Sequence, residues 1–577
     1  MVVALCYRRR LVPAKVFPMV RRFAAVSMMV FAGLPLQAQT PPAAPAKPLS
    51  VAAINARLYA PLPDDQAALK AHVLFLASDA MRGREAGSPE YDIAAQYVAA
   101  QFHAAGLKPA GDEGGYLQQV PLVTYTAAGE GEFVWTRRKG SGERLVFGQD
   151  YVPAGNPTRA AQSIAAPVVF VGYGIRAPQY GQDDYRGVDV RGKIVAYLGG
   201  APTRFGGEER AFFGSPRTKL QTAAARGAVA VIQIASPKAT PADVTRSATA
   251  YRAARVTWAN ADGTGHAEAS IALLGTLFPA GAAKLFGGAR MPWAAVVAEA
   301  AKPQPAYTAT RLVGTLSAAT KTAFAAARSS NVAGIIPGSD PKVGREVIVL
   351  SAHLDHIGVS SGSEGDRINN GALDDAVGIA SLIEEAKRFK ASGVAPKRSI
   401  LFLAVTAEEK GLIGSQYFAE HPTVPLEHIV ADVNLDMPIL LYRFEDMVAF
   451  GAERSTLGPI VRRAAAAVGV ALSPDPIPEQ GIFVRSDHFR FVEKGVPSVF
   501  LWPGPANAGK AASEAFLAGC YHKPCDDVNQ PILWDQGVRF VDINYRIARE
   551  IADGEERPVW NRGDYFGTLY KGRMAVK

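Results

Sequence analysis

The chain has 577 residues, of which 48% are hydrophobic and 20% charged, a balance typical of globular proteins that excludes a disordered or fibrous chain. At this length two or three domains are expected. The formal net charge of +9 falls to +3 without residues 1–38, which hold six Lys/Arg and no Asp or Glu. No basic run follows in the sequence, so nucleic acid is not an expected partner.

Residues 1–38 have the pattern of a signal peptide. Arginines at 21–22 precede the apolar stretch FAAVSMMVFAGLPL, and Ala38 is the predicted cleavage site. A start at Met19 would also give a complete signal. The alternative is an N-terminal membrane anchor, but about 14 apolar residues are fewer than the ~20 that span a bilayer. We predict export to the periplasm or the extracellular space, without stable membrane insertion after cleavage.

Two helices are predicted after the leader. Residues 39–62 contain the proline-rich run PPAAPAKP and are predicted to be a linker. Apolar residues then recur at helical spacing in residues 64–78 and 91–111. These helices belong to a first structural segment, residues 63–150.

The remaining chain divides into two segments of different character. Residues 151–325 contain short β-rich runs such as PVVFVGYGI, which indicate an inserted β-rich domain. In residues 326–577, by contrast, continuous apolar strands alternate with helices. Strands that are apolar on both faces indicate a sheet covered on both sides, so we predict an α/β fold with a mixed, largely parallel sheet flanked by helices.

Side chains that can bind metals follow the predicted strands of this sheet. They are His353, Asp355, Glu408, Glu409 and Asp436, with Asp374 and His522 in neighbouring loops. The carboxyl ends of such strands form the ligand-binding edge of a sheet. Converging carboxylates are costly to bury without a cation, and a donor set of Asp, Glu and His without thiolate suits zinc.

Six motifs resemble, in order and spacing, those of the co-catalytic di-zinc aminopeptidases, whose relatives include glutamate carboxypeptidase II and glutaminyl cyclases. The motifs are HLDH, NNGALDDAVGIASLIE, TAEEKGLIGS, VNLDMP, RSDHFRF and YHKPCDD. The resemblance makes residues 326–577 the catalytic zinc peptidase domain and residues 63–150 its N-terminal part. Through GKIV and KLQTAAARGAVAVIQI, residues 151–325 resemble the protease-associated domain often inserted there.

The resemblance implies a site with two Zn²⁺ ions. Asp374 would bridge the ions, His353 and Asp436 would complete one position, and Glu409 and His522 the other. Catalytic zinc sites of this kind are formed by imidazole and carboxylate donors and leave a position open for water.

The resemblance also implies an aminopeptidase mechanism on peptides with a free N-terminus. Metal-bound hydroxide would attack the scissile carbonyl, with Glu408 as general base. Asp355 would orient His353 through its second ring nitrogen, and Tyr521 and Arg485 would stabilise the tetrahedral intermediate. His356, Asp487 and His488 are predicted to lie near the site without binding metal, and the substrate pocket is predicted to include Phe483, Phe489, Phe491 and Trp502.

Three alternatives compete with this interpretation. GVSSG at 358–362 matches the serine hydrolase motif, but Ser360 falls in a predicted flexible loop instead of a strand-to-helix turn. A metal-free binding protein would lack some of the metal-binding residues, whereas all five are present in this sequence. A carboxypeptidase or a glutaminyl cyclase on the same fold remains open, the first requiring a basic pocket and the second a single zinc ion.

Cys520 and Cys525 are the cysteines of the sequence that lie outside the leader. Two cysteines so close together in an exported protein predict one local disulfide. The alternative, a cysteine metal site, needs more thiolates than two. The sequence predicts no oligomeric state.

Overall fold

The structure, a computed structural model, describes residues 50–137, 140–267 and 269–576. The predicted signal peptide lies outside the described residues. Helix α1 (Val51–Leu58) forms within the range predicted to be a linker. Among the described helices, none combines the length and the apolar character needed to cross a membrane.

The sheet predicted for residues 326–577 is present, and it is mixed and largely parallel. Its parallel strands are β14 (Val347–His353), β15 (Ser399–Val405), β16 (Ile429–Asn434) and β19 (Ser498–Pro503), with β14 between β15 and β16 and β19 beyond β16. Strand β17 (Asp446–Phe450) is antiparallel to β19. Runs of Val, Ile, Leu and Phe in these segments favour strands. The predicted fold class is confirmed.

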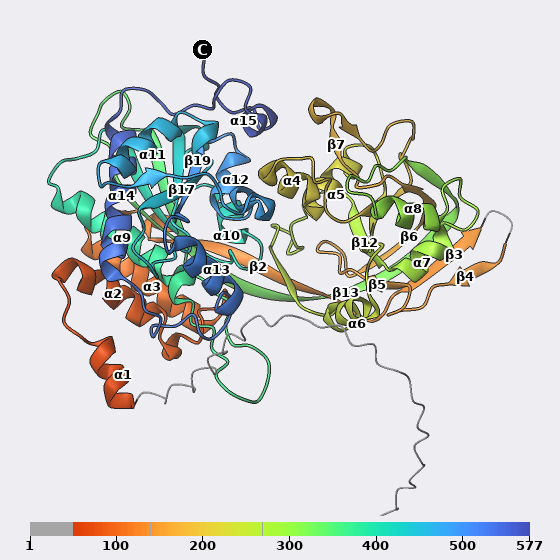
Figure 1. Cartoon of the computed structure of the whole chain (residues 1–577), viewed down its shortest axis with the longest axis horizontal. Helices are drawn as coiled ribbons and strands as arrows, with labels where there is room; N and C mark the ends of the chain where they lie inside the picture. Colours follow the sequence, from red (N-terminus) through yellow and green to blue (C-terminus); the bar gives the residue numbers. More distant parts are fainter. Residues whose placement is uncertain (1–49, 138–139, 268, 577) are drawn as a thin grey trace, which may run out of the picture. The chain divides into compact units, whose positions relative to one another are not determined.

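Alternate residues of the sheet enter two different cores, as expected for a sheet covered on both faces. In β14, Ile348 and Leu350 belong to one buried cluster, while Val347 and Val349 belong to another. The first core lies under four helices, α2 (Asp64–Leu76), α3 (Pro89–Ala104), α9 (Val377–Ala391) and α14 (Trp534–Asp553). The second includes residues of α10 (Ile413–Glu420) and α12 (His488–Val492). Figure 1 shows these helices on either side of the strands.

A separate buried cluster holds the inserted segment together. Its parallel strands are β6 (Ala161–Phe170), β9 (Ile194–Leu198), β10 (Ala230–Ile234) and β12 (Ala272–Leu277). Helix α5 (Pro216–Ala224) precedes β10. Phe133 and Trp135 of β3 (Glu132–Arg137) already belong to this cluster, upstream of the predicted limit at residue 151. The domain limits and the protease-associated assignment stay predictions.

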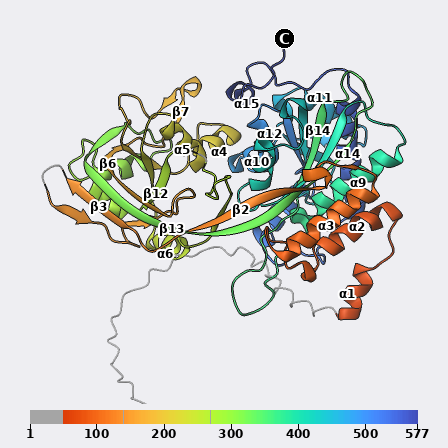
Figure 2. The ribbon, with the colours of Figure 1, turned by 180° about the vertical axis from the view of Figure 1, so that it is seen from behind.

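Strand β13 (Thr310–Ile336) belongs to the sheets of both segments. Its residues 310–321 pair with β6, and its residues 322–332 pair with β2 (Leu117–Ala127). Residues 332–336 then pair with β15 of the catalytic sheet. Figure 2 shows β2 and β13 running side by side. Residues 55–577 accordingly form one compact unit.

Candidate metal centre

The carboxyl ends of the parallel strands deliver the predicted site residues to one edge of the sheet. His353 is the last residue of β14, Glu408 and Glu409 follow β15, and Asp436 follows β16. Asp374 comes from a turn, residues 372–376, that leads into α9. Positive φ angles at Ala407 (54°) and Met437 (46°) turn the chain beside these residues. Such backbone conformations of non-glycine residues gather at functional sites.

The five predicted metal ligands are connected by short contacts between neighbouring side chains. Nε2 of His353 lies 3.1 Å from Oδ1 of Asp374 and 3.4 Å from Oδ1 of Asp436. Nε2 of His522 lies 3.2 Å from Oδ2 of Asp374 and 3.1 Å from Oε2 of Glu409. Asp374 thus contacts both His353 and His522, one through each carboxylate oxygen. We call His353, Asp374 and Asp436 the first metal position, and Asp374, Glu409 and His522 the second metal position.

The chemistry of these residues fits divalent cations. Oδ2 of Asp374 and Oε1 of Glu409 are buried. Imidazole nitrogens lie near both oxygens, but no described donor has the direction needed to hydrogen-bond to either. Buried carboxylates in such proximity repel unless a cation or proton lies between them. The donors are imidazole nitrogens and carboxylate oxygens, a set that suits zinc. The donor set of this site therefore fits zinc.

Asp375 lies close enough to join the first metal position, because its carboxylate lies within 4.8 Å of donor atoms of His353 and Asp436. Its oxygens are already used. They accept hydrogen bonds from the backbone N–H groups of His353 (3.3 Å), Gly378 (3.0 Å) and Met437 (2.9 Å). Asp375 therefore ties together the backbone of the residues around the site.

His356, which the sequence placed near the site, is buried beside the second metal position. Its Nδ1 lies 2.8 Å from Oε1 of Glu409 but 4.0 Å from Oδ2 of Asp374. His522 lies close to both carboxylates and is about one-third exposed toward the cavity. This geometry favours His522 over His356 as the imidazole donor between Asp374 and Glu409.

Asp355 occupies a different place from the one predicted. The ring of His353 contacts the backbone carbonyl of Asp355 through Nδ1, at 3.0 Å, and not its carboxylate. The Asp355 carboxylate instead accepts the backbone N–H groups of Glu408 (3.0 Å) and Glu409 (3.4 Å). The strand end turns back at this point, which brings these N–H groups to the carboxylate. Asp355 thus holds the backbone of both glutamates in place. Burial raises the pKa of the Glu408 carboxyl well above its usual range.

A cavity of about 540 Å³ opens onto the metal centre. Glu408, Tyr521 and Arg485 line it, together with Trp502. Arg485 is exposed, and its Nη1 lies 3.4 Å from Oε1 of Gln480.

The aromatic lining predicted from the sequence is mostly wrong. Phe483 and Phe489 are buried in a separate aromatic cluster, and Phe491 lies in the core beneath the sheet. Only Trp502 of the four predicted residues borders the cavity. Its indole N–H donates to the backbone carbonyl of Asp436 at 3.0 Å.

The motif RSDHF supplies support for the first metal position. Ser486 donates to Oδ2 of Asp436 at 2.5 Å, and Asn434 donates to the Ser486 hydroxyl at 2.6 Å. Asp487 accepts a hydrogen bond from Ser415 at 2.5 Å. Burial lowers the pKa of His488 to about 3, so this ring is neutral. Neither Asp487 nor His488 belongs to the two groups of donor atoms within 4.8 Å that the structure forms among its described residues.

Arg84, which the sequence did not single out, lies fully buried beneath the metal centre. Its guanidinium donates to four backbone carbonyls, those of Leu76 (2.6 Å), Leu354 (3.0 Å), Asn370 (2.6 Å) and Gly371 (3.1 Å). It thereby joins α2 and β14 to the turn that carries Asp374. Its acceptors are main-chain atoms, which no side-chain motif reveals.

Arg84→Ala is expected to destabilise the protein by at least about 3 kcal/mol, because it leaves several buried carbonyls without a donor. Urea unfolding followed by circular dichroism measures this change. Arg82→Ala is the matched control, since Arg82 has a similar φ but an exposed side chain that pairs with Glu90 at 3.4 Å. Its expected effect is within about 0.5 kcal/mol. Equal effects of the two substitutions would contradict the assigned role of Arg84.

Comparison with known proteins finds a family that part of the chain resembles. The model of peptidase family M28 matches residues 331–548. Leupeptin-inactivating enzyme 1 of Streptomyces exfoliatus is 31% identical over 205 residues, which are 33% of this chain and 42% of that protein. A vacuolar membrane protease of Yarrowia lipolytica is 35% identical over 98 residues, 17% of this chain and 9% of that protein. The chain thus spans less than half the length of these curated relatives.

Solved structures with similar folds include two aminopeptidases. An aminopeptidase from Aneurinibacillus sp. strain AM-1 is 19% identical, with 85% of this chain and 95% of that chain covered and a TM-score of 0.46. BSAP, a zinc aminopeptidase from Bacillus subtilis, is 18% identical, with 86% and 98% covered and a TM-score of 0.40. The matched segment contains all the residues of both metal positions. Residues 331–548 are thus similar to peptidase family M28.

Proposed function

We propose that the protein is an exported zinc aminopeptidase, which removes N-terminal residues from peptides. The observation that carries this proposal is the placement of Asp374 between two groups of donors, with Glu408 lining the same cavity. The residues His353 and Asp436 would hold one zinc ion, and Glu409 and His522 the other. We assign residues 151–325 to a protease-associated domain as part of the same proposal.

The side chains around the centre are suited to peptide hydrolysis. When bound, the zinc ions would supply Lewis acidity that polarises the scissile carbonyl and lowers the pKa of water. Glu408 accepts a proton from the attacking water and passes it to the leaving amine. Burial raises the pKa of Tyr521, so its hydroxyl keeps its proton and can donate to the developing oxyanion.

The charges of the cavity support recognition of the N-terminus. Carboxylates of Glu408, Asp436 and Glu514 line it, and they favour a substrate ammonium group. Arg485 is the arginine of the lining, and it lies exposed beside Gln480 instead of forming a basic pocket for a C-terminal carboxylate. Apolar side chains on the same wall, among them Phe500 and Trp502, favour an apolar N-terminal residue.

Leucine p-nitroanilide is therefore expected to be a substrate, while its N-acetylated form and substrates with only a free C-terminus are not cleaved. Removal of metal with 1,10-phenanthroline is expected to abolish release of p-nitroaniline, and added zinc to restore it. Magnesium serves as the control, because the imidazole donors of this site bind it poorly. Activity that withstands chelation, or that appears only on blocked amines, would refute the proposal.

A further inference from the structure

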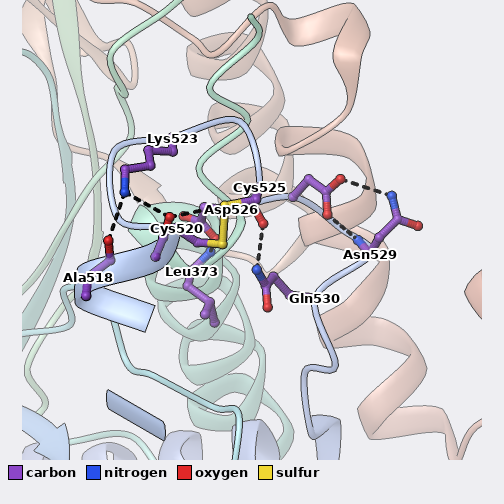
Figure 3. The surroundings of a disulfide bond; sticks show 10 residues. Leu373, Ala518, Cys520, Lys523, Cys525, Asp526, Asn529 and Gln530 are labelled. Carbon is purple, nitrogen blue, oxygen red and sulfur yellow. Dashed lines mark hydrogen bonds between the residues drawn. A yellow bond between two sulfur atoms is a disulfide. The ribbon is translucent and has the colours of Figure 1, made fainter. Parts of the chain in front are cut away.

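The loop that carries His522 is closed by a disulfide. Cys520 and Cys525 are bonded, as the sequence predicted, with their Cα atoms 5.2 Å apart (Figure 3). The bond closes a short loop that contains Tyr521 and His522. This loop follows helix α13 (Gly509–Gly519). The ring of Tyr521 stacks on that of His522, with centroids 3.8 Å apart.

His522 needs such a constraint because its backbone is in a conformation that side chains disfavour. Its φ is +56°, in the left-handed region. Non-glycine residues hold this conformation when the surrounding structure imposes it. The backbone N–H groups of Cys520 (2.8 Å) and Tyr521 (3.0 Å) both donate to the carbonyl of Phe516, which fixes only the first end of the loop.

The second end of the loop is bonded to the backbone of the bridging carboxylate. Asp526 is fully buried, and its side chain accepts the N–H groups of Leu373 (2.9 Å) and Asp374 (3.1 Å). Its backbone carbonyl accepts the N–H of Ala372 at 3.1 Å. Figure 3 shows Asp526 directly after Cys525 and beside Leu373. The disulfide therefore links the fixed first end of the loop to the end that holds Asp374.

The first metal position depends on this loop only through the shared Asp374, whose backbone N–H Asp526 accepts. His353 ends strand β14 and Asp436 follows strand β16, so the sheet itself places both side chains. Ser486 and the backbone around Asp375 support them further. In the second metal position, by contrast, His522 comes from the disulfide loop. Its Nε2 lies 3.2 Å from Asp374 and 3.1 Å from Glu409, whereas Nδ1 of His356 lies 4.0 Å from Asp374.

We propose that the Cys520–Cys525 disulfide positions His522, so that opening the bond selectively weakens the second metal position and spares the first. This inference rests on the proposed function, since it assumes that both positions take zinc. Partners that orient a metal ligand typically contribute about 10- to 100-fold in metal affinity. We expect a loss of this size at the second metal position.

Opening the bond requires a two-electron reductant, and a water-soluble phosphine supplies it. Phosphorus attacks one sulfur, the S–S bond breaks, and water delivers the oxygen of the resulting phosphine oxide. Its two protons go to the two sulfurs, which become thiols. Cys525 is exposed, so the reagent can reach the bond. A phosphine is preferred to a dithiol because thiolates themselves bind zinc.

The test measures zinc per chain by elemental analysis after equilibration at limiting free zinc. The full-length oxidised protein is compared with protein reduced by the phosphine and then alkylated. We expect the zinc content to fall from about two ions to about one per chain, since only the second position loses affinity. Cobalt substitution gives a second readout, because its visible spectrum reports loss of one site independently of activity.

Two variants separate positioning from general damage. Cys520→Ser/Cys525→Ser is expected to hold about one zinc ion without any reductant and to show no response to the phosphine. Lys523→Ala is the matched control in the same loop. It removes the side-chain bonds to the carbonyls of Ala518 (2.8 Å) and Gly519 (3.0 Å) but keeps the disulfide, so two ions should remain until reduction. If the double variant fails to fold, the zinc content of the reduced native protein tests the proposal instead. Circular dichroism then checks that the reduced protein is folded.

The outcomes that overturn the inference are distinct from failure of the proposed function. Two ions retained after complete reduction would mean that the disulfide is not needed, for example because His356 replaces His522. Loss of both ions from a folded, reduced protein would contradict the selectivity. If instead the oxidised protein binds no transition metal at all, the proposed function itself fails and this inference falls with it.

Discussion

Glu408→Gln is expected to lower kcat by about 10²- to 10⁴-fold while zinc content stays unchanged. Glutamine keeps the shape of the side chain but cannot accept the proton of the attacking water. Glu408 lies in the cavity, whereas the short contacts to His522 are made by its neighbour Glu409. Steady-state kinetics on leucine p-nitroanilide together with elemental analysis measure both quantities.

Glu514→Gln is the control for this substitution, because Glu514 is a carboxylate on the same cavity but is exposed on helix α13. It should change KM more than kcat if it helps to bind the substrate ammonium group. Loss of zinc in Glu408→Gln would show that the roles of Glu408 and Glu409 are exchanged.

Asp374→Asn is expected to remove zinc from both positions and to abolish activity. The asparagine amide is neutral, and its nitrogen cannot bind a cation, so neither position keeps its shared carboxylate. The expected loss of affinity exceeds the 10- to 100-fold typical of residues that only orient a ligand. Isothermal titration of the metal-free variant with zinc measures it.

Asp366→Asn serves as the matched control, since Asp366 is an exposed carboxylate in the loop before the same turn. Its zinc affinity should equal that of the native protein. Two ions bound with native affinity to Asp374→Asn would exclude a bridging role for this residue.

The sequence was sufficient for the catalytic sheet because each of its strands is a continuous apolar run bounded by polar loops. His353, Glu409 and Asp436 could be grouped for the same reason, since each lies at or just after the carboxyl end of one of these parallel strands. Strand β13 was not predicted, because it is rich in Ala, Ser and Thr and lacks a clear apolar alternation. The roles of the grouped residues stay predictions until metal binding is measured.

Contacts to main-chain atoms and the directions of side chains could not be predicted from the sequence. Arg84 donates only to carbonyls, and Asp526 accepts only backbone N–H groups, so neither forms a recognisable side-chain motif. Phe483 and Phe489 lie near the site in sequence but point into a neighbouring aromatic cluster. A residue's distance from a motif along the chain does not fix the side of the backbone on which its side chain lies.

Strand β13 has a consequence for how the protein melts. Its residues 310–321 pair within the inserted segment and its residues 322–336 within the catalytic sheet, without a break in the strand. Unfolding of either sheet therefore removes a strand with which the other sheet pairs. Domains joined by a loose tether commonly denature in separate steps. Here the shared backbone couples the two parts, so the loss of one should bring about the loss of the other in a single cooperative transition.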